Sequence, residues 1–408
     1  MRIVLGVSVF FGMAAVAIAS TVYDITDLGT LGGDSSVAFA VSGNGQAAGW
    51  ATDPPGNTEA VILGGASPQS LGAGQATGIN SLGQVSGTVS SNGATHGVVW
   101  SGGSVVDFGA NTSAAAINDA GQVAGSTNHA FLYQNGAETD LGTLAGGSWT
   151  LAEGLSGNGD VAGYGNTAAG LRGFVWMPGE GLEDLGTLGG GSSYGMAVDD
   201  SGQAVGSAAV TAGYLHAAEW LNGAATDLGT LGGNNSYAYG INDSGLIVGY
   251  SWTGGNAATH GFVVLDGVMI DLNSLLSPAD SGWAITAAYG INDQGQIVGE
   301  ALYDGVSHAI LLNDPPGAPL FTSPGSAAPE PATWLLSGTA TLFLLVWYRI
   351  NRPNRRGALA DRLPALARSG PDARPHRDRR QPVWRECGGH PRAPFADVRP
   401  APEQATRR

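Results

Sequence analysis

Five of the seven histidines occupy one position of an internal repeat, so a circle of imidazoles is a candidate metal site. Imidazole nitrogens are common ligands of transition metals. The position falls on the third of four expected strands, toward the outside of each unit, where equivalent residues lie far apart. We therefore predict no metal site and expect each imidazole to bond a neighbouring backbone group. The histidines are His96, His129, His216, His260 and His308, and Arg172 and Glu59 replace them in two units.

A second repeated phrase offers oxygen ligands of the kind that Ca²⁺ prefers. It supplies few carboxylates per copy, and no calcium-binding loop pattern follows it. Asn and Asp bond their own backbone in tight turns, and Gly takes positive φ there, so hairpin turns explain the phrase fully. We expect turns. The copies are Asn118-Asp119, Asp199-Asp200, Asn242-Asp243 and Asn292-Asp293.

The sequence shows no motif of an enzyme. It has no nucleophile elbow, and its Gly-rich loops lack the Lys and the strand-to-helix context of a phosphate cradle. Two carboxylates could form a glycosidase pair, and the sequence neither supports nor excludes one. Aromatic strand ends could stack on sugars, but packing between units is the expected role of Trp100, Tyr133, Trp176 and Trp220. We predict no catalytic residue and no cofactor.

The elements that carry these residues follow from the repeat. Seven units can be aligned on their turn glycines, each with four short apolar stretches separated by turns, and four antiparallel strands in about 40 residues is the size of a propeller blade. The glycines are Gly45, Gly83, Gly121, Gly159, Gly202, Gly245 and Gly295. A phrase Asp-Leu-Gly-Thr-Leu closes the fourth strand, beginning at Asp27, Asp140, Asp184 and Asp227, with a looser copy at Asp271.

The two ends of the repeat region are complementary. The last unit has three strands, and residues 22–28 form a fourth strand with no three before it. We predict an all-β, seven-bladed β-propeller over residues 20–314, in which the N-terminal strand completes the last blade and protects its edge. An open β-solenoid is the alternative, and it would leave residues 22–28 unpaired with the final unit.

The unit resembles the HAF repeat of bacterial extracellular proteins. The resemblance is carried by His129-Ala130-Phe131-Leu132-Tyr133, by the Asp-Leu-Gly-Thr-Leu-Gly-Gly runs and by the Asn-Asp-x-Gly-Gln turns, over residues 22–314. It implies a secreted or surface protein and no particular activity.

Charge is distributed unevenly along the chain. There is no Lys, and residues 20–330 carry 27 acidic residues against the single Arg172, a net charge of −26. Such a body repels phosphate backbones, so we expect no nucleic-acid binding. The only cysteine is Cys387, which leaves the repeats without a disulfide or a thiolate metal site.

The N-terminus reads as a secretory signal peptide over residues 1–19. Arg2 gives the positive start, residues 3–16 are apolar, and Ala17 and Ala19 are the small residues that signal peptidase recognises. An uncleaved anchor is the alternative, and the short apolar run argues against it.

A second membrane signal follows the repeats. A Pro-rich linker (residues 315–331) ends in Pro329-Glu330-Pro331, and an apolar transmembrane helix is expected at residues 332–350. The basic cluster that stops transfer on the cytoplasmic side is Arg349, Arg352, Arg355 and Arg356. This layout resembles the PEP-CTERM sorting signal of Gram-negative bacteria, which implies processing by an exosortase. A plain C-terminal anchor is the alternative.

The final segment, residues 351–408, departs from that family pattern because such signals normally end soon after the Arg cluster. It is rich in Arg, Pro and Ala, and we predict a basic disordered tail. Its abrupt change of composition suggests a frameshift product, which sequencing of the gene around Arg356 would test.

Together these features predict an exported protein, anchored in the inner membrane by one helix before sorting and then placed at the cell surface or in the extracellular matrix. We interpret it as a monomeric, non-enzymatic binding or structural module, with extracellular polysaccharide as its candidate ligand and with signal peptidase and exosortase as processing partners. The alternative is a glycan-processing enzyme on a propeller scaffold, and a weaker one is an anchored sensor.

Overall fold

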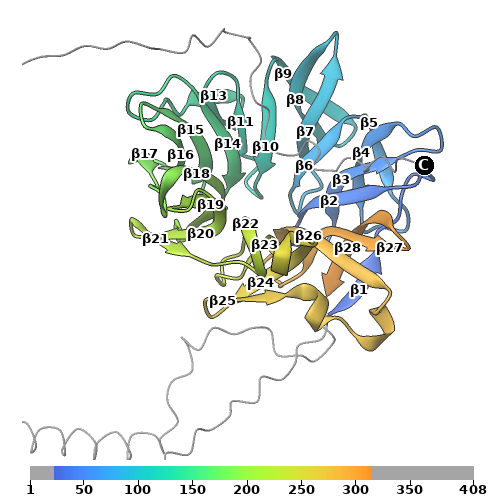
Figure 1. Ribbon diagram of the computed structural model, residues 1–408. Helices are drawn as coiled ribbons and strands as arrows, with labels where there is room; N and C mark the ends of the chain where they lie inside the picture. Colours follow the sequence, from blue (N-terminus) through green and yellow to red (C-terminus); the bar gives the residue numbers. More distant parts are fainter. Residues whose placement is uncertain (1–22, 314–408) are drawn as a thin grey trace, which may run out of the picture. The chain divides into compact units, whose positions relative to one another are not determined.

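The computed structural model describes residues 23–313, which form seven four-stranded antiparallel sheets arranged in a ring (Figure 1). Each sheet is one blade, and in six of the seven blades the strands follow each other in chain order from the centre of the ring outward, while in the seventh the N-terminal strand is outermost. The predicted all-β, seven-bladed propeller is therefore confirmed.

Blades 1 to 4 take their strands from residues 36–184. Blade 1 comprises β2 (Ser36–Val41), β3 (Ala47–Thr52), β4 (Thr58–Leu63) and β5 (Gln69–Ala73). Blade 2 comprises β6 (Gln75–Ile79), β7 (Val85–Ser91), β8 (Ala94–Ser101) and β9 (Ser104–Ala110). Blade 3 comprises β10 (Ser113–Ile117), β11 (Val123–Ser126), β12 (Ala130–Gln134) and β13 (Ala137–Asp140). Blade 4 comprises β14 (Thr150–Leu155), β15 (Val161–Thr167), β16 (Gly170–Met177) and β17 (Gly181–Asp184).

Blades 5 to 7 complete the ring. Blade 5 comprises β18 (Gly189–Val198), β19 (Ala204–Val210), β20 (Leu215–Leu221) and β21 (Ala224–Asp227). Blade 6 comprises β22 (Gly232–Ile241), β23 (Ile247–Thr253), β24 (Thr259–Leu265) and β25 (Val268–Asp271), with short 3₁₀ turns at Gly254–Asn256, Leu272–Leu275 and Pro278–Asp280 around it. Blade 7 comprises β26 (Trp283–Ile291), β27 (Ile297–Tyr303), β28 (Val306–Asn313) and β1 (Asp24–Asp27).

The N-terminal strand closes the ring, as predicted. β1 pairs antiparallel with β28, from Asp24 opposite Asn313 to Asp27 opposite Ile310. Just before it, the Tyr23 N–H donates to the Leu275 carbonyl at 2.8 Å, and the Tyr23 side chain is 1% exposed. The closing segment is thus held both by a ladder and by a buried aromatic ring, and the open-solenoid alternative is wrong.

The hydrophobic core lies between blades. One cluster, for example, joins Val205 and Ala217 of blade 5 to Ala238, Ile247 and Phe262 of blade 6, all of them buried. Alanines fill many of these sites because neighbouring sheets approach closely near the centre, and close-packed interiors tolerate little extra volume there.

The phrase Asp-Leu-Gly-Thr-Leu has a structural reason at each position. Its first Leu is buried, as Leu28 and Leu228 are, and its Thr hydroxyl closes the following turn, as Thr30 Oγ1 does by donating to the Gly33 carbonyl at 2.9 Å. Its Gly takes positive φ, +79° at Gly29, which favours glycine. The phrase therefore ends one strand and turns the chain toward the next blade.

Several predicted segments lie outside the described residues. They are the signal peptide (1–19), the linker (315–331), the expected transmembrane helix (332–350) and the tail (351–408). Within residues 23–313, no helix is long and apolar enough to cross a bilayer.

Candidate functional site

Four of the five repeated histidines face the Asp that begins the repeated phrase, and His96 faces Asp107 at the equivalent position. The His308 imidazole Nδ1 lies 3.0 Å from Asp27, which joins the last strand of the chain order to the first. The expectation of a backbone partner is wrong, because the fourth strand places a carboxylate directly beside the third-strand imidazole. We call these pairs the clasps: His96–Asp107 (2.9 Å), His129–Asp140 (3.0 Å), His216–Asp227 (3.0 Å), His260–Asp271 (2.7 Å) and His308–Asp27 (3.0 Å).

The clasp carboxylate also accepts a second hydrogen bond, from the backbone. In each case it also accepts an N–H two residues further on, as Asp227 does from Gly229 at 2.8 Å and Asp140 from Gly142 at 2.8 Å. Burial acts to raise the pKa of Asp140, but the hydrogen bonds from His129 and Gly142 outweigh it and hold this pKa below its ordinary value. The carboxylates are therefore already committed to structural bonds.

The two units without His use other bonds at the same position. The Arg172 guanidinium donates to the carbonyls of Leu171 and Gly191 at 2.8 and 2.6 Å, and Glu59 accepts a short hydrogen bond from Ser70. In the part of the chain that the structure describes, no three His, Cys, Asp or Glu side chains are placed to hold a metal ion.

The Asn-Asp-x-Gly segments form the expected hairpin turns, and they also link the blades. Asn118 Nδ2 donates to the Ser156 carbonyl of the next blade at 2.9 Å, and Asn292 Nδ2 donates to the Ser42 carbonyl at 2.9 Å across the ring closure. Every one of the seven blade junctions carries such a turn-to-turn bond. The other five are Asn44 to Ser81, Asn80 to Asn118, Asn158 to Asp200, Asp200 to Asp243 and Asn242 to Asn292.

The aromatic strand ends pack between blades, as predicted. Trp100 and Trp220 are buried in core clusters, and Tyr133 and Trp176 lie half-buried against two others. Trp100 and Trp220 are therefore not available as stacking platforms.

A different set of residues surrounds the axis of the ring. The first strands of neighbouring blades contact each other all the way round (Figure 1), and in each of them the cross-strand register skips one residue at the same repeat position, which forms a β-bulge. β-Bulges re-aim a side chain and are frequent beside functional sites. We call these residues the axial ring, and all seven are half-buried: Phe39, Thr77, Ala115, Glu153, Met196, Tyr239 and Tyr289.

The residue after each bulge is small because the next blade lies against it. A Cβ added to Gly154 would lie 2.6 Å from the Met196 carbonyl oxygen, and one added to Gly290 would lie 2.8 Å from that of Phe39. The geometry of the axial ring is thus fixed by the repeat, while the side chain at the bulge is free to vary.

Aromatic residues occupy the axial ring in blades 6, 7 and 1. The Tyr289 ring lies 5.3 Å from Phe39 and 5.5 Å from Tyr239, both edge-on, and Tyr239 stacks on Tyr250 at 5.6 Å, which contacts Tyr237 at 5.1 Å. A second group of rings, in blades 4 and 5, joins Tyr194 to Tyr164 at 5.1 Å and Tyr164 to Trp149 at 6.1 Å. We call these eight residues the aromatic arc.

Glu153 is the only carboxylate of the axial ring. Protein atoms surround it, yet part of its surface remains open to water, as expected for a side chain beside the axis. Burial raises the pKa of Glu153 to about 7. The same environment raises the pKa of Tyr164, first through burial and then through the Glu153 charge, which places the carboxylate near the arc.

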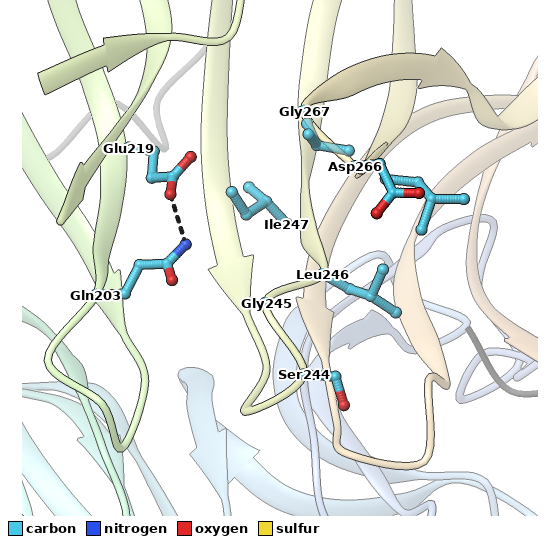
Figure 2. Close-up of a pocket in the computed structure, with 10 residues that line it drawn as sticks. Gln203, Glu219, Ser244, Gly245, Leu246, Ile247, Asp266 and Gly267 are labelled. Atoms are coloured by element: carbon cyan, nitrogen blue, oxygen red, sulfur yellow. Dashed lines mark hydrogen bonds between the residues drawn. The ribbon is translucent and has the colours of Figure 1, made fainter. Parts of the chain in front are cut away.

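A separate hollow opens between blades 5 and 6 at their hairpin turns (Figure 2). It encloses about 220 Å³, below the roughly 300 Å³ at which ligand pockets begin. One of its two carboxylates, Glu219, already accepts a 2.9 Å hydrogen bond from Gln203, as Figure 2 shows. The hollow is therefore a weak candidate site.

The remaining predicted site residues lie outside the described part of the chain. These are Ala17 and Ala19 for signal peptidase, Pro329, Glu330 and Pro331 for sorting, and Arg349, Arg352, Arg355 and Arg356 for membrane stop.

Comparisons with known proteins give distant matches to solved structures. No family model matches the sequence, and no curated protein matches it. Among solved structures, the β-propeller domain of the Trilobed protease from Pyrococcus furiosus is 12% identical with a TM-score of 0.43, covering 60% of this chain and 85% of that one. The structure of YCF48 bound to D1 peptide is 12% identical with a TM-score of 0.42, covering 73% and 99%.

TolB from Acinetobacter baumannii is 13% identical with a TM-score of 0.36, and the match covers 46% of this chain and 51% of TolB. The chain thus spans about half the length of that structure. At this level the likeness concerns the β-propeller fold class alone.

Proposed function

We propose that this chain is an exported, non-enzymatic binding module that engages extracellular polysaccharide at the axis of its propeller. The aromatic arc carries this proposal. Sugar rings present apolar faces that pack on aromatic side chains, and half-buried tyrosines offer both a ring and a hydroxyl that can hydrogen-bond. Tyr289, in ring contact with both Phe39 and Tyr239, makes a row of three rings on neighbouring blades, which is longer than a single sugar unit needs.

A binding role accords better with the axial carboxylate than an enzymatic one does. Hydrolysis of glycosidic bonds ordinarily uses two carboxylates on either side of the bond. Within residues 23–313, burial alone raises the pKa of Glu153, and no second acidic side chain contributes to that shift. The axial ring itself holds one acid among seven residues.

Export and sorting complete the proposal. The signal-peptide features around Ala17 and Ala19 and the sorting motif Pro329-Glu330-Pro331 support delivery to the cell surface or matrix through signal peptidase and an exosortase. Fractionation of cells with and without the Glu330→Ala variant tests this step. We expect the variant to stay in the inner-membrane fraction, and unchanged surface delivery would contradict the sorting role.

A glycan array tests the binding step. The full-length chain is applied with and without calcium, next to a double variant with Tyr239→Leu and Tyr289→Leu and to the control Tyr214→Leu, whose side chain is exposed outside the arc. We expect binding to one polysaccharide class and at least about tenfold loss in the double variant only. Equal binding by all three proteins would overturn the axial site.

A further inference from the structure

The unpaired carboxylate of Glu153 points to the chemistry of the ligand. Among residues 23–313, the Glu153 carboxylate makes no hydrogen bond or ion pair with protein atoms, and its oxygens reach solvent. The clasp carboxylates, in contrast, each hold two partners. A carboxylate that is partly desolvated but still reaches solvent is open to a cationic partner from outside the fold.

The charge of the whole body favours a cation as that partner. The described chain contains no Lys. Its single Arg, Arg172, lies on the third strand of blade 4, and its guanidinium already donates to two carbonyls. At the turns of blades 4 to 6, burial and neighbouring carboxylates raise the pKa of Asp160 and Asp243, so this rim is crowded with negative charge. Uronates, sulfates and phosphates would meet only repulsion here.

The aromatic arc favours the same partner. The face of a tyrosine ring is negative and attracts ammonium groups within about 6 Å, and the attraction grows when water is excluded. Tyr164 and Tyr194 are in ring contact at 5.1 Å, and the charge of Glu153 acts on Tyr164. A carboxylate beside aromatic faces is a combination that suits an amine better than a hydroxyl.

We propose that the axial ring binds a glycan that carries a positively charged amine, with the amine at Glu153 and the sugar rings along the aromatic arc. This inference rests on the proposed polysaccharide-binding function and narrows it to amino sugars with a free amine. No bond is made or broken, and the ligand's ammonium replaces water at the carboxylate.

Three glucosamine oligomers of equal length separate this inference from the broader function. One carries free amines, one is N-acetylated and neutral, and one is N-trimethylated, so that its charge does not titrate. Binding of each to the full-length chain is measured by calorimetry. At pH 8, where the free amines of glucosamine are mostly unprotonated, we expect the trimethylated oligomer to bind at least about tenfold more tightly than the neutral one. The free-amine oligomer should bind more tightly than the neutral one only closer to neutral pH, where part of its amines are protonated.

The charge of the trimethylated oligomer does not change with pH, so any pH dependence of its binding reflects the titration of Glu153. Only the ionised carboxylate attracts the cation, so the apparent affinity scales with the ionised fraction. Burial places the pKa of Glu153 at about 7, so affinity should rise about tenfold or more between pH 5.5 and pH 8. The Glu153→Gln variant should bind the cationic oligomers weakly with a flat pH profile.

The control is Glu219→Gln, which removes another half-buried carboxylate away from the axis and should leave affinity and pH profile unchanged. Equal binding of all three oligomers, with no effect of Glu153→Gln, would overturn the amine and retain the polysaccharide function. Failure of every oligomer to bind would overturn both. Thermal unfolding of each variant confirms that it is folded, and Glu153→Gln removes a buried charge while keeping the side-chain shape.

Discussion

The clasps and the axial ring occupy equivalent places in successive blades but differ in what the repeat holds constant. At the clasps the residue types recur, and each copy makes the same pair of bonds. At the axial ring the backbone bulge recurs, while the residue changes from Phe39 to Thr77 to Glu153. A residue type that recurs from copy to copy indicates a structural role. A residue type that varies on a recurring backbone indicates a position whose side chain can be used for binding.

Closure of the ring is the largest expected effect, because every blade depends on it. Tyr23→Ala removes a side chain that is 1% exposed within the cluster that joins blades 6 and 7. We expect the free energy of unfolding to fall by about 3–5 kcal/mol. Urea unfolding followed by tryptophan fluorescence measures this, with the exposed Tyr214→Ala as control. A loss below about 1 kcal/mol would show that the closing segment is not essential.

Ionisation of Glu153 in the axial ring should lower the free energy of unfolding as the pH rises. The native state holds the Glu153 proton to about pH 7, whereas the ordinary value is 4.5, so the native state binds more protons in this window. Its contribution to stability is complete below about pH 4.5 and is lost as pH rises through about 7.

The variant Glu153→Gln should therefore be more stable than the parent at pH 8, by about 1–3 kcal/mol, and the two should converge at pH 4.5. Urea unfolding at both pH values measures the difference, with the exposed Glu138→Gln as control. A variant that is less stable at pH 8 would show that Glu153 is paired and would remove the contrast with the clasps.

A single clasp should matter least. An exposed ion pair contributes about 0.2–1 kcal/mol, so His216→Ala should lower the free energy of unfolding by no more than that. Asp227→Ala should cost about 1–2 kcal/mol because it also frees the Gly229 N–H. Neither should alter ligand binding. A loss of binding in His216→Ala would break the division between structural and functional positions.

The clasp carboxylates should stop contributing to stability at acidic pH. The pKa of Asp140 lies below its ordinary value of 3.8, so its contribution is present above that value and disappears as pH falls through the lower native one. Acid unfolding of Asp140→Asn and its parent should therefore converge below about pH 3, and a difference that persists there would contradict the role of this carboxylate.

The fold could be predicted well from the sequence because the repeat length and its turns are typical of propeller blades. The turn glycines set the blade count, and the unmatched strand at residues 22–28 identified the closure that β1 and β28 make. The signal for the clasps was also present: His216 and Asp227, like His96 and Asp107, are eleven residues apart. That spacing has meaning only once the hairpin register is known, and it was missed.

The axial ring was missed for a deeper reason. A bulge changes no residue type, so Tyr239 reads as one apolar residue in an alternating strand until the register reveals the bulge between Ala238 and Gly240. Its trace in the sequence is a variable residue before a small one, as in Glu153-Gly154 and Tyr289-Gly290. The bulge positions surround the axis because the first strand of each blade lies innermost. The amino-acid composition does not show which strand that is.

The most direct test is a crystal structure of the full-length chain with a bound glucosamine oligomer. The account predicts sugar rings against Tyr239 and Tyr289 at the axis, with an amine within hydrogen-bond distance of the Glu153 carboxylate. An oligomer bound instead at the clasps, or in the hollow between Gln203 and Glu219, would contradict it.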